Sequence, residues 1–135
     1  MQQTPPDVEE ERAKLEYRLL QIELQERAKK DFLYFSKYVW EGVIIGSHHK
    51  IMAEAFNKII NGSLKRLIIN MPPRHTKSEF ASYLLPAFAM GHKPNTKIIQ
   101  ATHTGELAVR FGRKVRNLMD AETYKQLFPD VALRA

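Results

Sequence analysis

The feature that most constrains the fold of this chain is an apolar run that stops at two prolines and is followed by a Lys-Ser pair. Residues 64–70 have the length and the aliphatic composition of a buried parallel strand. Proline donates no hydrogen bond to a central ladder, so Met71-Pro72-Pro73 must end that strand. A helical pattern starts at Lys77 or Ser78. The sequence therefore predicts a strand, a tight loop and a helix in direct succession.

A second strand and helix are expected further along. Residues 96–101 read as another buried strand, and Thr104 is placed to cap a helix over residues 105–119. Pro86 lies inside the preceding helical pattern and predicts a kink or an early end. The order strand, loop, helix, strand, helix implies an α/β fold with parallel strands and right-handed crossovers.

The N-terminal segment, residues 1–30, is predicted to be a helical extension. Asp7 is placed to cap a helix over residues 8–30, and acidic residues near its start and basic residues near its end suit the helix dipole. Two apolar stripes run along it, one of Leu15, Leu19 and Ile22, the other of Tyr17, Leu20 and Leu24. Two interpretations stay open: a solvated helix docked by one face, or a partner-binding, coiled-coil arm.

Two shorter helices are expected between this extension and the first strand. Asp31 can cap an aromatic helix that is more typical of core than of a base-stacking platform. Ser47 can cap an amphipathic helix ended by Asn61-Gly62. The predicted apolar positions are Phe32, Phe35, Tyr38, Val39 and Trp40 in the first helix, and Ile51, Met52, Ala55, Phe56, Ile59 and Ile60 in the second.

The composition indicates which class of binding partner the chain favours, but it does not identify one partner. The chain has 135 residues, enough for one compact domain, and its 21 Lys+Arg against 15 Asp+Glu give a net charge of +6. Such a charge favours nucleic acid or nucleotide phosphates. There is no cysteine, and hence no disulfide or cysteine metal site. The polar, acidic start is unlike a signal peptide, and no apolar run nears the ~20 residues that span a bilayer, so a soluble protein that is not secreted is expected.

The Lys-Ser pair has the chemistry of a phosphate-binding loop. Such a loop needs backbone N–H groups at a helix start, a lysine near the phosphates and a hydroxyl for Mg²⁺. Lys77 and Ser78 match the last two requirements. Met71 and Thr76 stand where the standard pattern has glycines, and a β-branched residue at position 76 would adopt a glycine-like backbone at a cost of ~1 kcal/mol or more. An ordinary strand-to-helix turn with an exposed Lys-Ser pair is the alternative.

A family resemblance favours the phosphate loop. From Arg66 the chain reads RLIINMPPRHTKSE, which is similar to the divergent phosphate loop of phage terminase large subunits, PPRHGKS, with Thr76 as the one departure. Other segments resemble the family in the same order, so that the likeness extends from Asp31 to Pro129: they are Ser47-His-His-Lys50, Lys97-Ile-Ile-Gln-Ala-Thr-His-Thr104, Glu106-Leu-Ala108, Phe111-Gly-Arg-Lys-Val-Arg116 and Leu127-Phe-Pro129.

The resemblance implies that residues 31–135 are the N-terminal portion of a RecA-type P-loop ATPase domain (Walker A type) in a viral genome packaging motor. Such a motor binds ATP and Mg²⁺ and drives DNA translocation into a procapsid. Its expected partners are DNA, further terminase subunits in a homo-oligomeric ring, the small terminase subunit and the portal, in the cytoplasm of an infected bacterial host.

Site residues follow from the resemblance position by position. Lys77 would contact the phosphates, Ser78 would hold Mg²⁺ through its hydroxyl, and Arg74 would stabilise charge on the γ-phosphate as a catalytic residue. His49 would lie near the adenine, with an exposed helix-start histidine as the alternative. The remaining ATP-binding residues would be Pro73, His75 and Thr76.

Two further groups are weaker candidates. Thr102 and His103 would end the second predicted strand, the edge at which open α/β sheets bind ligands. Three basic residues on one face of the last long helix could contact DNA phosphate or a neighbouring subunit, or could simply be a solvated surface. These are Arg110, Arg113 and Lys114.

The hydrolytic part of such a motor is missing from the sequence. None of the acidic residues after the phosphate loop follows an apolar strand, so the expected Asp-Glu pair is absent, and no room remains for a nuclease domain. We expect a fragment of a gene, or half of a split one, with negligible ATPase or nuclease activity on its own. The alternatives are a small basic nucleic-acid-binding protein and a motor-interacting protein without ATPase activity.

Overall fold

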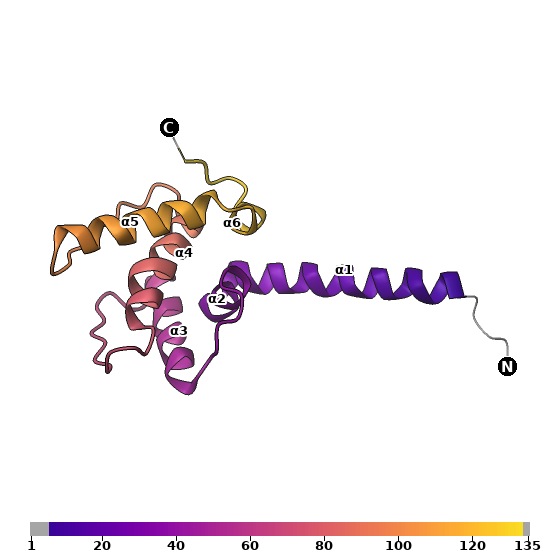
Figure 1. Ribbon diagram of the computed structural model, residues 1–135, viewed down its shortest axis with the longest axis horizontal. Coiled ribbons are helices and arrows are strands. Elements are labelled where there is room, and N and C mark those ends of the chain that lie inside the picture. Colours follow the sequence, from indigo (N-terminus) through magenta and orange to yellow (C-terminus); the bar gives the residue numbers. More distant parts are fainter. Residues whose placement is uncertain (1–5, 134–135) are drawn as a thin grey trace.

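The computed structural model describes residues 6–133, and every regular element within them is a helix. Helix α1 projects from a body in which the other helices pack together (Figure 1). The elements are α1 (Pro6–Lys30), α2 (Phe32–Val39), α3 (Ser47–Ile60), the π-helical turn η1 (Glu79–Leu84), α4 (Leu85–His92), α5 (Gly105–Asp120) and α6 (Glu122–Leu127).

The predicted α/β fold, a partial RecA-type P-loop domain with parallel strands, is wrong for this structure. Residues 64–70 and 96–101 are irregular, and residues 6–133 contain no strand. The side chains of Ile68 and Ile99 are 86% and 96% exposed, so these segments are not buried either. A strand exists only beside a partner that accepts its hydrogen bonds, and an apolar run says nothing about where that partner is.

An aromatic cluster forms the core in place of a sheet. The Phe32 ring contacts three other rings edge to face, with centroids 5.0 Å away at Phe56, 5.6 Å at Phe80 and 5.5 Å at Phe88. All four side chains are at most 1% exposed. Because the four rings come from α2, α3, η1 and α4, this cluster packs these four elements together. Phe32 and Phe35 are core residues, as predicted.

Helix starts were predicted well where a polar side chain caps them. The carboxylate of Asp31 accepts from the N–H groups of Leu33 at 2.8 Å and Tyr34 at 3.2 Å. Thr104 Oγ1 accepts from the Leu107 N–H at 3.3 Å at the start of α5. Both caps were expected, and α1, α2, α3 and α5 lie within a few residues of their predicted ranges.

Other local expectations were wrong in detail. The cap of α3 is Gly46 rather than Ser47, which is the first helical residue. Helix α1 begins at Pro6, so Asp7 lies in its first turn and does not cap it. On α3, Ile51 was expected in the core and is 70% exposed.

Pro86 does not end its helix, in which helical residues run from 77 to 92, but the turn directly before it, Glu79–Leu84, is π-helical, and such turns are places where helices kink. The proline falls in the first turn of α4, directly after the π-helical turn. An α-helical N–H at position 86 would bond to the Ser82 carbonyl. That carbonyl instead accepts from Gln100 Nε2 at 2.7 Å, so the missing donor is replaced from the segment 96–101.

The C-terminal part of the described chain closes the core. Tyr124 is fully buried, and its hydroxyl donates to the Ala87 carbonyl at 2.7 Å. Phe128 is 8% exposed and lies directly against Gly91, where a Cβ would come within 2.7 Å of the ring. Gly91 is therefore required by packing, and the Leu127-Phe-Pro129 tripeptide contributes two buried residues, Leu127 and Phe128.

Within residues 6–133, no helix has both the length and the apolar character to cross a bilayer.

Candidate functional site

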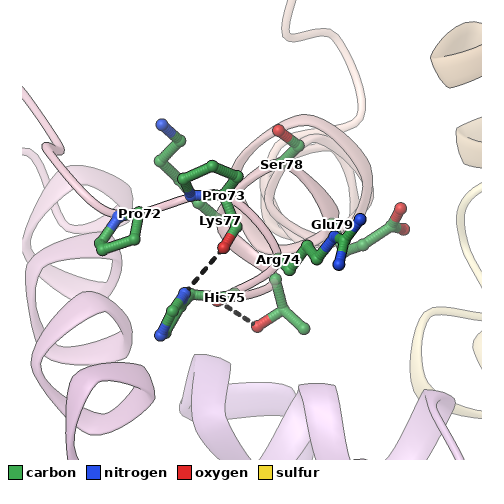
Figure 2. A pocket seen from close by; sticks show the side chains of 8 residues that line it. Pro72, Pro73, Arg74, His75, Lys77, Ser78 and Glu79 are labelled. Atoms are coloured by element: carbon green, nitrogen blue, oxygen red, sulfur yellow. Dashed lines mark hydrogen bonds between the residues drawn. The ribbon is translucent and has the colours of Figure 1, made fainter.

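The loop ahead of the helix at residues 77–92 curves around an open hollow of about 500 Å³. Its lining is one continuous stretch, Pro72 to Glu79. Figure 2 shows the side chains of Lys77 and Ser78 on one side of this loop and that of His75 on the other. The hollow is thus built by the segment that the sequence had singled out, without a sheet behind it.

Two residues of the loop have left-handed backbone conformations. Arg74 has φ 65° and Thr76 has φ 58°. Position 76 therefore does adopt the conformation that glycine enters freely, and a β-branched residue there stores roughly 1–2 kcal/mol of strain. Alternation of right- and left-handed residues makes the type of concave backbone turn that binds anions.

The backbone of the loop has unused donors. Within residues 6–133, the first hydrogen bond at the start of this helix is Phe80 N to Thr76 O at 3.0 Å, so the N–H groups of Lys77, Ser78 and Glu79 have no partner within the helix. Free N–H groups at a helix start carry the positive end of the helix dipole. They supply the donors that a phosphate group needs.

The charged side chains of the loop are also uncommitted. Neither Arg74 nor Lys77 forms an ion pair with any residue between positions 6 and 133. Arg74 and Ser78 are exposed, and Lys77 is partly buried. Because Lys77 and Ser78 occupy the first turn of the helix, an ammonium and a hydroxyl stand beside the free N–H groups.

His49 connects α3 to this loop. Its Nδ1 accepts from the Gly46 N–H at 2.9 Å, which requires that the neutral ring carry its proton on Nε2. That Nε2–H bonds to Thr76 Oγ1, while the Thr76 hydroxyl donates to the His75 carbonyl at 2.6 Å. The imidazole is 4% exposed, so the alternative of an exposed helix-start histidine is excluded. The expected adenine contact of His49 stays a prediction.

Three histidines gather beneath the loop. The His48 ring lies 3.8 Å from that of His49 and 5.7 Å from that of His75, measured between centroids. Burial lowers the pKa of His49, and the nearby His48 and His75 lower it further. The neutral imidazole is therefore the form that the fold favours, which agrees with its bonds to Gly46 and Thr76.

The basic residues predicted on α5 divide into two kinds. Lys114 Nζ lies 3.1 Å from both carboxylate oxygens of Glu79 and 5.5 Å from the centre of the Tyr83 ring, so it joins α5 to η1. Arg110 and Arg113 are exposed and form no ion pair in the described part of the chain. Only these two are free for an external phosphate.

Thr102 and His103 lie outside the hollow. Thr102 Oγ1 donates to the Thr104 carbonyl at 2.6 Å, which tightens the turn before α5, and His103 is exposed. Residues 6–133 contain no sheet edge that would bring them to the loop, and neither residue lines its hollow.

Sequence reasoning missed the contacts that hold the loop in place. His49 and Thr76 are 27 residues apart, and Lys114 and Glu79 are 35 apart. Such pairs have no local signature, because spacing rules concern neighbours on one element. The nearest signal was the resemblance, which placed His49 near the nucleotide.

Comparison of the chain with protein-family models, with curated proteins and with solved structures gives no match.

Proposed function

We propose that this chain is the nucleotide-binding part of a terminase large subunit, the motor that couples ATP hydrolysis to viral DNA translocation into a procapsid. One observation carries the proposal: the loop of residues 72–79 has a concave, partly left-handed backbone with free N–H groups, followed at once by Lys77 and Ser78. This combination binds phosphate for reasons that do not depend on a sheet.

Each side chain has a distinct part in this proposal. Lys77 neutralises phosphate charge close to the free N–H groups, and the Ser78 hydroxyl is the ligand offered to Mg²⁺. Arg74 is exposed at the rim, where a guanidinium can stabilise charge that develops on a terminal phosphate. His49 acts through Thr76, so within this proposal it is a positioning residue for the loop.

Electrostatics favours the DNA partner. The net charge is +6, and Arg110 and Arg113 are exposed on α5 with no carboxylate bound to them between residues 6 and 133. Phosphate contacts of this kind give binding that weakens as salt rises. ATP hydrolysis itself is assigned to the complete motor, and the isolated chain is expected to bind nucleotide without turning it over.

The test is calorimetric titration of the chain with Mg-ATP, for the wild type and for Lys77→Ala. A charge-assisted hydrogen bond contributes about 1.5–3 kcal/mol, so the variant should bind at least about tenfold more weakly. Lys93→Ala is the matched control, because Lys93 is an exposed lysine at the far end of the same helix.

Three results of this titration would decide whether the loop of residues 72–79 binds the nucleotide. Loss of affinity in Lys77→Ala with normal affinity in Lys93→Ala supports the proposal. Equal affinities in all three proteins would place the nucleotide elsewhere. A folded wild-type chain that binds no nucleotide, verified by its helical circular dichroism, would refute the phosphate loop.

A further inference from the structure

Helix α1 has an apolar surface that the rest of the described chain, up to residue 133, leaves uncovered. Every residue from Asp7 to Leu20 is exposed, a stretch about 20 Å long at 1.5 Å per residue. Contacts with the body begin near the C-terminal end, where Gln25 Nε2 donates to the Tyr38 hydroxyl at 3.1 Å and Ala28 is fully buried. Figure 1 shows the remainder of α1 extending away from the body.

The two apolar stripes of α1 lie on opposite faces. Tyr17, Leu20 and Leu24 are 66%, 52% and 37% exposed. At 100° per residue they share one face, while Leu15 and Leu19, exposed by 56% and 66%, lie on the other. A helix with such side chains in water is only marginally stable unless an apolar face is packed.

One of these faces has the spacing of a coiled-coil seam. Its successive positions alternate steps of three and four residues, the a and d pattern of a heptad repeat. An acidic residue begins the seam and a basic residue ends it. The position after the acidic residue is occupied by a small side chain, that of alanine. The positions are Glu10, Ala13, Tyr17, Leu20, Leu24 and Arg27.

We infer that two copies of this chain pair through α1 in antiparallel orientation along that seam. This alignment sets Tyr17 of one copy against Leu20 of the other and the small Ala13 against Leu24. It also sets Glu10 against Arg27 at both ends of the seam, because the pairing is symmetric. In the single chain, Glu10 pairs with the exposed Lys14 on the same helix, whereas Arg27 pairs with Glu23 on α1 and donates to the Tyr34 hydroxyl of α2 at 3.3 Å.

Charge selects both the orientation and the face. Parallel pairing would bring Glu10 against Glu10 and Arg27 against Arg27, which is repulsive at close range. On the opposite face, Arg12 and Glu26 flank three apolar positions, Leu15, Leu19 and Ile22, so antiparallel pairing there would place one of these charges against an apolar side chain. The acidic first turn and the basic last turn of α1 favour the same antiparallel arrangement.

The first experiment measures oligomeric state by sedimentation from micromolar to millimolar concentration, for the wild type, Leu20→Glu and Leu19→Glu. The two leucines are adjacent and both largely exposed in the single chain, so neither substitution disturbs the core. We expect a wild-type dimer, at least about tenfold weaker dimerisation in Leu20→Glu, and no change in Leu19→Glu. A monomeric wild type, or dissociation by Leu19→Glu and not by Leu20→Glu, would overturn the inference.

Cysteine pairing then tests orientation, since the natural chain has no cysteine. Glu10→Cys and Arg27→Cys are prepared as separate chains and oxidised alone and as a mixture. A disulfide requires Cα atoms within about 7 Å, so antiparallel pairing gives the mixed disulfide far in excess of either homodisulfide. Efficient homodisulfides from each variant alone would show parallel helices and contradict the inference. The result is independent of nucleotide binding.

Discussion

Two apolar regions of this chain differ in burial: one forms the core and the other is largely exposed to solvent. The phenylalanines of α2, α3, η1 and α4 are buried around Phe32, whereas most aliphatic residues of the segments 64–70 and 96–101 are exposed, Ile68 and Ile99 almost fully. Helices satisfy their own backbone hydrogen bonds, so they can bury a face as soon as another helix is near. An extended segment needs a neighbour for its backbone before it can be buried.

The largest expected effect separates these two regions directly. Phe32→Ala removes a ring that contacts three others and should lower the free energy of unfolding by about 3–5 kcal/mol in urea denaturation. Ile99→Ser replaces a side chain that is 96% exposed and should change it by less than about 0.5 kcal/mol. Similar losses in the two variants would mean that the segment 96–101 is buried in solution.

The bond between His49 and Thr76 is the point at which the exposed loop is tied to the helical body. Thr76→Val keeps the shape of the side chain but leaves the buried imidazole N–H without its acceptor, which should cost about 1–2 kcal/mol. The wild type is the reference, because threonine and valine are equally β-branched at this left-handed position, whereas Thr76→Ser would also relieve backbone strain. A Thr76→Val protein as stable as the wild type would show that the bond contributes nothing.

Tyr124 tests a hydrogen bond inside the core. Tyr124→Phe removes the hydroxyl that donates to the Ala87 carbonyl at 2.7 Å and should destabilise the protein by about 1 kcal/mol, measured by thermal denaturation. Tyr17→Phe is the reference, because Tyr17 is 66% exposed. A loss in Tyr17→Phe as large as that in Tyr124→Phe would contradict the assignment.

The smallest effect concerns pH. The pKa of His49 is lowered by burial from its ordinary value of 6.5, so the unfolded chain binds the proton more tightly than the folded one. Stability should therefore fall as pH drops below 6.5, and the fall should continue until the lowered pKa is passed. His92 is shifted in the same direction, also mainly by burial. His49→Gln should reduce the slope of stability against pH; an unchanged slope would assign the effect to other groups.

The sequence was informative where structure is decided by neighbours along the chain. The caps at Asp31 and Thr104, the ranges of the long helices and the aromatic core depend on spacings of a few residues, and those were predicted correctly. The left-handed backbone at Thr76 could be anticipated because a glycine is missing there. These features require no knowledge of the tertiary fold.

What could not be predicted depends on distant partners. The prediction of two strands was wrong because an apolar run of six or seven residues does not specify which segment lies beside it. Helix α6 was missed, as were the bonds of Tyr124 to Ala87 and of Lys114 to Glu79, which join segments 35 or more residues apart. For the candidate site, the loop residues came from the sequence, whereas the histidine beneath them came only from a resemblance.

The unbroken helix from residue 77 to residue 92 has a mechanical consequence. It is one continuous helical segment of sixteen residues, of which Glu79–Leu84 form a π-helical turn. One end carries Lys77 and Ser78, and the other holds Gly91 against the ring of Phe128 with no space for a Cβ. A displacement of the first turn along the helix axis is therefore also a displacement against Phe128, which couples the loop of residues 72–79 to the C-terminal side of the body.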